Sequence, residues 1–212
     1  MLWRMRRFRK SMYCRALIIM KFFTKPEIIS LIVIFLVLAA VATPNFIISL
    51  EKARDQVRRD DMGALNHAFD QYLAEFNNAL PAATPDGRII DCLKPGAKPI
   101  KNKSGGWDYT PIPCEWGTDA FTNLITGEVY MQRLPQDPDY KKGVKYLYLT
   151  DGNRYQIYAS MEAKDEAEID PGIIARGLYC GTRICNIGRS YNVPINISIK
   201  AYDDLLQKQN GK

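Results

Sequence analysis

The sequence is poor in the residues that most catalytic sites need. Its 212 residues include one histidine, His67, so any Ser-His-Asp triad would have to use that side chain. His67 stands in a helical pattern with no nucleophile motif near it, which favours a solvated or groove-packed helix residue. The chain also lacks a nucleophile elbow, a phosphate-binding glycine loop and a cluster of metal ligands. We therefore expect no enzymatic activity, no cofactor and no metal site.

Acidic residues are absent before Glu27, and this absence explains the net charge. The formal charge is +6, yet the remainder of the chain is close to neutral. A nucleic-acid-binding domain needs basic residues spread over a folded face that can follow phosphates, so we expect the folded domain to bind no nucleic acid. The basic residues before the apolar segment are Arg4, Arg6, Arg7, Arg9, Lys10, Arg15, Lys21 and Lys25.

Charged residues are also absent from residues 28–50. At a rise of about 1.5 Å per residue this segment spans roughly 34 Å, against about 30 Å for the hydrocarbon core of a bilayer. A cleavable signal would be shorter and followed by a small-residue cut site, whereas this run continues into a charged helical pattern. Because basic flanks stay in the cytoplasm, we expect a single-pass inner-membrane protein with a cytoplasmic leader over 1–22 and an extracytoplasmic C-terminal domain.

Cysteines are few, and their positions agree with that orientation. Cys92, Cys114, Cys180 and Cys185 follow the apolar segment, whereas Cys14 lies in the basic leader. The four exported cysteines lack the CxxC spacing of zinc sites and would lie in an oxidising compartment. They allow three disulfide connectivities. We favour Cys92 with Cys114 and Cys180 with Cys185, because each pair closes a short loop; free thiols are the alternative.

Residues 51–78 have apolar side chains every three or four positions, which predicts an amphipathic helix. Gly63 is its only weak point, so the membrane helix over 23–50 is expected to continue unbroken to about Asn77, where Asn78 and Pro81 help to end it. The apolar stripe consists of Ala53, Val57, Met62, Leu65, Phe69, Tyr72, Leu73 and Phe76, with Arg58, Arg59, Asp60, Asp70 and Glu75 between them.

Residues 79–212 form the extracytoplasmic region, and their pattern predicts a small antiparallel sheet. Residues 81–117 are rich in proline, glycine and lysine, which indicates a long irregular loop with at most short strands. The fold class is therefore α+β: a long N-terminal helix packed on a small sheet with disulfide-tied loops. Period-two alternation predicts strands over 127–134, 144–150 and 154–161, the last two joined by an Asp-Gly turn, with a short strand or two over 179–199 and a helical turn or two over 198–209.

The segment before the apolar run carries a recognisable motif. Phe23-Thr24-Lys25-Pro26-Glu27 is followed within the run by Pro44. The pattern resembles the N-terminus of type IV pilins and type II secretion pseudopilins, whose mature chain begins with Phe, has Glu as its fifth residue and Pro as its twenty-second. Counted from Phe23, Glu27 and Pro44 occupy those positions. The resemblance is specific over about 23–76 and looser beyond.

The resemblance implies cleavage between Phe22 and Phe23 by a prepilin peptidase and methylation of Phe23. Two residues depart from the family pattern. The peptidase usually cuts after Gly, where this chain has Phe22, and Lys25-Pro26 replaces an apolar pair. A chain that keeps its leader therefore stays an open alternative.

Glu27 and Pro44 each have a local and an assembly interpretation. Thr24 and Glu27 fit a capping box, in which each side chain serves the other's backbone donor. By resemblance, the Glu27 carboxylate would also neutralise the N-terminal amine of a neighbouring subunit. Pro44 is tolerated in a lipid-buried helix, and by resemblance marks where the helix bends or melts in a filament.

These observations predict a structural protein, a pilin or pseudopilin that leaves the membrane to join a filament. Its expected partners are copies of itself or related pilins, the prepilin peptidase, the assembly machinery and membrane lipid. A signal-anchored protein that never assembles is the rival. Residues 164–170 are acidic, and some pseudopilins bind calcium in a C-terminal loop; a solvated loop is the default, because no EF-hand spacing is present.

Overall fold

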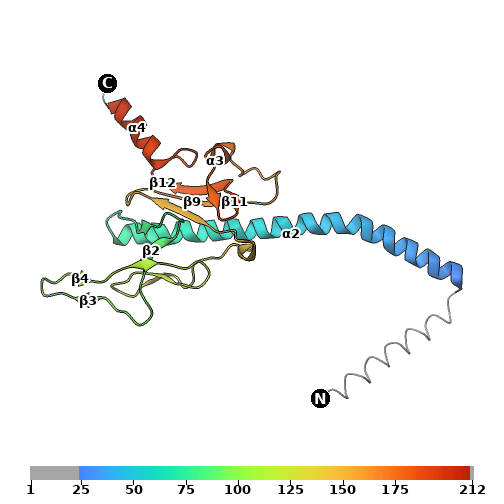
Figure 1. The fold of residues 1–212 in the computed structure, drawn as a ribbon, viewed down its shortest axis with the longest axis horizontal. Helices are drawn as coiled ribbons and strands as arrows, with labels where there is room; N and C mark the ends of the chain where they lie inside the picture. The colour runs from blue at the N-terminus through green and yellow to red at the C-terminus, as the bar shows by residue number, and fades with distance from the viewer. Residues whose placement is uncertain (1–23, 211–212) are drawn as a thin grey trace, which may run out of the picture. The chain divides into compact units, whose positions relative to one another are not determined.

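The computed structural model describes residues 24–210, so Cys14, Phe22 and Phe23 lie outside the described residues. The chain divides into two compact units, Met1–Leu50 and Glu51–Lys212, and each is described by itself. In the second unit a helix packs with short antiparallel strands (Figure 1). The predicted α+β class is confirmed.

A single helix, α2 (Lys25–Glu75), runs through both units. It ends in a turn where Asn77 and Asn78 have φ angles of 53° and 64°, a left-handed conformation that asparagine tolerates better than most residues. The Asn78 N–H donates to the Leu73 carbonyl at 2.9 Å and closes the last turn. The helix therefore stops close to the end predicted from the asparagine pair.

The strands are short and, in the described residues, make five small antiparallel sheets. The two largest have the strand orders β1-β2-β5 and β12-β9-β8, and the others pair β3 with β4, β6 with β7 and β10 with β11. The strand bounds are Ala82–Ala83 for β1, Ile89–Cys92 for β2, Ile100–Lys101 for β3, Trp107–Asp108 for β4, Ile112–Pro113 for β5, Phe121–Thr122 for β6, Val129–Met131 for β7, Leu147–Thr150 for β8, Tyr155–Ala159 for β9, Tyr179–Cys180 for β10, Arg183–Ile184 for β11 and Ile187–Tyr191 for β12.

Strands β8 and β9 form the hairpin predicted around the Asp-Gly turn. Asp151 Oδ1 accepts the backbone N–H groups of Asn153 and Arg154 at 2.9 and 2.8 Å. Gly152 has a φ of 94°, which is accessible to glycine at little cost. Strand β12 then pairs along the other edge of β9 and completes the sheet.

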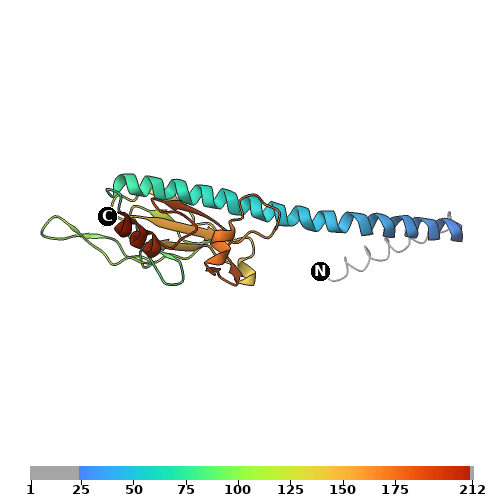
Figure 2. The ribbon, with the colours of Figure 1, turned by 90° about the horizontal axis from the view of Figure 1, so that it is seen from above.

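The core of the second unit lies between α2 and these sheets (Figures 1 and 2). The Phe69 ring lies 4.9 Å from Tyr148 of β8, 4.8 Å from Tyr155 of β9 and 5.6 Å from Phe121 of β6, between ring centroids. Such aromatic pairs contribute about 0.5–1.5 kcal/mol each beyond the area they bury. The stripe predicted for the helix therefore does face the core from Met62 onward.

Two disulfides tie the loops, Cys92–Cys114 and Cys180–Cys185, which is the local pairing that loop length favoured.

The C-terminal helix is longer than the predicted turn or two. Within residues 24–210, the other helices are the 3₁₀ helix η1 (Tyr140–Lys142), α3 (Pro171–Ala175) and α4 (Ile199–Asn210).

Candidate functional site

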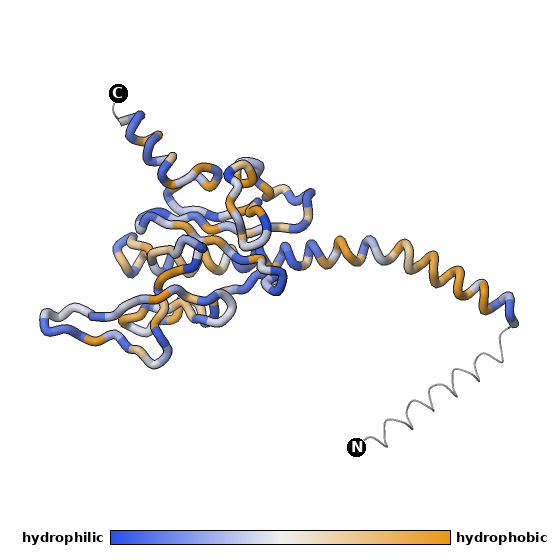
Figure 3. Tube along the Cα trace, in the orientation of Figure 1, coloured by the Kyte–Doolittle hydropathy of each residue, from blue (hydrophilic) through white to orange (hydrophobic). Residues whose placement is uncertain are grey.

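In the first unit, α2 presents apolar side chains on all sides. The large apolar residues from Ile29 to Leu38 are 53% to 69% exposed, and Figure 3 shows a nearly continuous hydrophobic stretch there. By length and composition this stretch is able to cross a membrane, although a signal sequence passes the same test. It fits the single-pass anchor predicted from the sequence.

The polar groups of this stretch bond within the helix itself. Pro44 lies inside α2 and has no N–H to donate. On either side of it, the Thr43 hydroxyl donates to the Ala39 carbonyl at 2.6 Å and the Asn45 amide donates to the Val41 carbonyl at 3.3 Å. Lipid offers no hydrogen-bonding partners, so donors that are satisfied internally suit a membrane-embedded helix.

Glu27 caps the start of α2. The Thr24 backbone N–H donates to Glu27 Oε2 at 2.7 Å, which is one arm of the predicted capping box. This bond uses one carboxylate oxygen of an exposed side chain, so the charge is also accessible to a second donor. The role of Glu27 between subunits stays a proposal.

In the second unit, a buried cluster of charges centred on Arg58 fastens α2 to the domain. The fully buried guanidinium of Arg58 donates to both carboxylate oxygens of Asp137, at 2.8 and 2.9 Å, to Asp55 at 2.7 Å and to Glu162 at 3.0 Å. Asp55 also accepts the backbone N–H of Ala163 at 2.9 Å. Burial opposes the charge, but the hydrogen bonds and charge of Asp137, with the bonds to Glu162 and Asp55, together outweigh it and raise the pKa of Arg58.

Further ion pairs lie next to Arg58. The Asp139 carboxylate pairs with Lys142 at 2.9 Å and with Arg183 at 3.0 Å. The Arg54 guanidinium donates two hydrogen bonds to the Glu162 carboxylate, at 2.6 and 2.7 Å. Burial raises the pKa of Asp139, but the bond to Lys142 and the charge of Arg183 hold it well below its ordinary value. The cluster therefore balances acids with bases, and its geometry suits a rigid joint.

Sequence reasoning missed this cluster. It placed Arg58 between the apolar positions and Val57 among them, whereas Arg58 is fully buried and Val57 is 45% exposed. A signal was present: Asp55 and Arg58 continue the core-facing register of Met62 and Leu65 toward the N-terminus. Charged residues at core spacing predict a buried ion pair when partners exist elsewhere in the chain.

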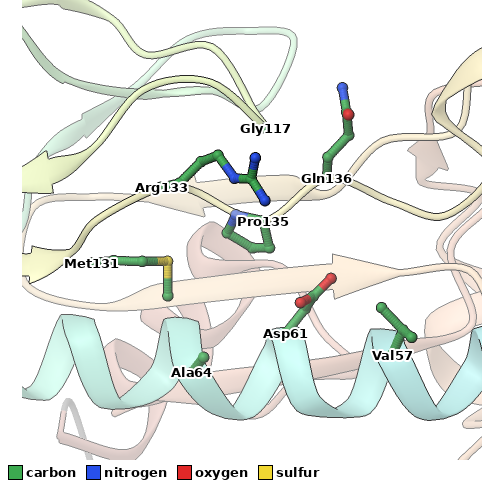
Figure 4. Close-up of a pocket in the computed structure, with 8 residues that line it drawn as sticks. All are labelled: Val57, Asp61, Ala64, Gly117, Met131, Arg133, Pro135 and Gln136. Atoms are coloured by element: carbon green, nitrogen blue, oxygen red, sulfur yellow. The ribbon is translucent and has the colours of Figure 1, made fainter.

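The exposed Val57 belongs to a groove beside α2 (Figure 4). The groove has a volume of about 520 Å³. Within it the Asp61 carboxylate accepts the Tyr146 hydroxyl at 2.5 Å, and burial raises the pKa of Asp61. The floor and walls are lined by Val57, Asp61, Ala64, Gly117, Met131, Arg133, Pro135 and Gln136.

The carboxylates of the acidic segment 164–170 bind neighbouring elements of the domain. Glu166 and Glu168 both pair with Arg59, at 2.5 Å, and Asp170 caps α3. No three His, Cys, Asp or Glu side chains among residues 24–210 are grouped so that they could hold a metal. The carboxylates of Glu166 and Glu168 therefore bind α2, and that of Asp170 binds α3.

Comparison with curated proteins finds the type II secretion system core protein G of Vibrio cholerae serotype O1. The two sequences are 29% identical over 136 residues, which cover 64% of this chain and 74% of that protein. No family model and no solved structure matches the chain. The prepilin-like N-terminus, the long helix on a small disulfide-tied sheet and this similarity together support the resemblance to type IV pilins and type II secretion pseudopilins.

Proposed function

We propose that this protein is a structural subunit of a type II secretion-like or type IV pilus filament, and not an enzyme. The observation that carries the proposal is the exposed apolar first half of α2, which continues without a break into a helix locked to a folded domain. The similarity to a named secretion-system protein supports the same role.

Before assembly, residues 28–50 would hold the chain in the inner membrane, with the basic leader in the cytoplasm and the disulfide-tied domain outside. During assembly the same side chains would exchange lipid contacts for contacts with neighbouring helices. Copies related by one repeated head-to-tail contact form an open helical filament. The Arg58 cluster would hold each domain in a fixed orientation on its own helix α2.

Glu27 would assist this step by pairing with the N-terminal amine of a neighbouring subunit. The free-energy cost of placing a charged carboxylate near the membrane is smaller when the carboxylate pairs with a cation. The pairing requires a free amine on Phe23, and therefore cleavage after Phe22 by the prepilin peptidase.

Glu27→Gln separates this role from capping. Glutamine can still accept the Thr24 N–H at the third position of a capping box, so membrane insertion should be unchanged. Recovery in filaments sheared from the cell surface should fall sharply, because no charge faces the amine. Pro44→Ala is the companion control, since it removes the helix breaker without touching that charge. Wild-type recovery of Glu27→Gln would contradict the charge-pair role.

The rival function is a signal-anchored protein that does not assemble, which Phe22 in place of the usual glycine favours. Mass spectrometry of the mature N-terminus distinguishes the two. A methylated Phe23 is expected for a filament subunit, and an intact Met1 with no protein in the sheared fraction would support the rival.

A further inference from the structure

The hairpin β3–β4 projects from the second unit without joining its core. In Figures 1 and 2 it extends past the Glu75 end of α2. Ile100 is 70% exposed and Trp107 is 42% exposed, and neither belongs to the buried clusters. Large apolar side chains on a protruding element are a frequent mark of a contact surface.

The turn of this hairpin is well formed by its own bonds. Asn102 Oδ1 accepts the Gly106 N–H at 2.8 Å and the Ser104 hydroxyl at 2.8 Å, and the Asn102 N–H donates to the Gly106 carbonyl at 2.8 Å. The hairpin is therefore a pre-shaped element, and a partner would not have to order it on binding.

The two faces of the hairpin differ. Lys101 lies opposite Trp107 in the antiparallel pair, and Ile100 lies opposite Asp108. Directly opposed residues share one face of a two-stranded sheet. One face therefore presents the Trp107 indole beside the Lys101 ammonium group. A surface complementary to this face would have an apolar pocket next to a carboxylate.

The groove beside α2 has that combination, nearer the start of the second unit. Val57, Ala64, Met131 and Pro135 supply apolar lining, and Asp61 supplies a carboxylate on the helix wall; Arg133 lies on the facing wall. A rise of about 1.5 Å per residue puts Ala64 roughly 17 Å before the Glu75 end of α2. The hairpin and the groove thus face different copies when domains are stacked along α2.

Charge favours the same pairing. The hairpin segment 94–109 contains four lysines, Lys94, Lys98, Lys101 and Lys103, and one acid, Asp108. From residue 60 to its end α2 contains four acids and neither lysine nor arginine, the acids being Asp60, Asp61, Asp70 and Glu75. Complementary potentials of this kind fix the register of an interface and suppress wrong pairings.

We propose that the β3–β4 hairpin of one copy docks in the α2 groove of the next copy, with Trp107 against Val57 and Ala64 and with Lys101 beside Asp60 and Asp61. The contact is heterologous, because the hairpin of one copy fills a different surface, the α2 groove, of the next copy, and such contacts propagate into filaments. The inference rests on the proposed function as a filament subunit, and it names the surface by which the domains contact each other.

Cysteine cross-linking in the full chain tests the contact. Lys101→Cys and Ala64→Cys are combined, which leaves Trp107 and Val57 in place, and sheared filaments are oxidised and run on a non-reducing gel. The double variant should give a ladder of covalent multimers, whereas each single variant should give none. Lys101→Cys combined with Lys200→Cys, on α4, is the matched control and should give no ladder.

Two substitutions of exposed apolar residues provide the second arm. Trp107→Ala should lower filament recovery roughly tenfold, as expected for a buried aromatic anchor, with no change in the thermal midpoint of the full chain. Ile100→Ala, on the opposite face of the same hairpin, should leave recovery within about twofold of wild type. Filaments of the cysteine double variant without a ladder would overturn the docking contact and leave the proposed function standing. Absence of any filament from the wild-type protein would overturn both.

Discussion

Replacing Arg58 by methionine should be among the most damaging single changes in the domain. Methionine keeps an unbranched apolar stem but removes all five hydrogen bonds that the guanidinium donates. It leaves two fully buried carboxylates, Asp55 and Asp137, without their cation. Asp55 keeps the backbone N–H of Ala163 and Asp137 keeps that of Asp139, so the loss is that of the charge partner.

The size of the effect follows from that burial. Breaking a buried ion pair by removing one partner costs about 3–5 kcal/mol, which is a large share of the roughly 5–15 kcal/mol by which domains are stable. For a domain of 150–250 residues each kcal/mol lowers the thermal midpoint by about 2–4 °C. Arg58→Met should therefore melt about 6–20 °C below wild type.

The measurement is thermal unfolding of the full chain in detergent, followed by near-ultraviolet circular dichroism of the buried tyrosines. Arg59→Met is the matched control, because Arg59 also makes two ion pairs but its side chain is 23% exposed, with Glu166 20% and Glu168 51% exposed. Two partly exposed pairs together contribute about 1 kcal/mol, so its midpoint should fall by about 2–4 °C. If the two variants melt within about 2 °C of each other, the reasoning from burial is wrong.

Three further predictions concern other parts of the domain. Asp91 is 6% exposed and its Oδ2 has no hydrogen-bond partner in the structure; burial raises its pKa to about 7. Between about pH 4 and pH 7 the folded state then holds a proton that the unfolded state has released, so the free energy of unfolding should fall as pH rises through this range. Asp91→Asn should recover up to about 4 kcal/mol of that stability at pH 8, measured by thermal melts. A variant no more stable than wild type at pH 8 would contradict this. Replacing both cysteines of Cys92–Cys114 by serine should cost about 3 kcal/mol, against about 2 for the shorter loop of the other disulfide, and non-reducing digestion that links the two pairs would contradict the local connectivity. Gly63→Ala should stabilise the chain by about 0.5–1 kcal/mol in urea titration, because a Cβ there meets nothing within 4 Å and glycine is a poor helix residue; lower stability would mean that this face is not free.

Much of the architecture was readable from the sequence because it depends on local patterns. The uncharged run over 28–50, the helical spacing after it and the asparagines at its end predicted one long helix. The period-two alternation on either side of Asp151-Gly152 predicted the β8–β9 hairpin. Short loops favoured the disulfide pairing that the structure has. Each of these signals lies within a few residues of the element that it specifies.

The Arg58 cluster and the groove depended on residues far apart in the sequence. Arg58 and its partner Asp137 are separated by 79 positions, and the groove joins helix residues to a loop more than fifty positions later. A charge on an amphipathic helix reads as solvent-facing unless its partner is known, because burial without a partner would be too costly. The sequence by itself determined the long apolar helix, its core-facing stripe from Met62 onward and the β8–β9 hairpin. The tertiary structure decided that the helix face before Met62 is buried through charges, since only the folded chain brings Asp55, Arg58 and Asp137 together.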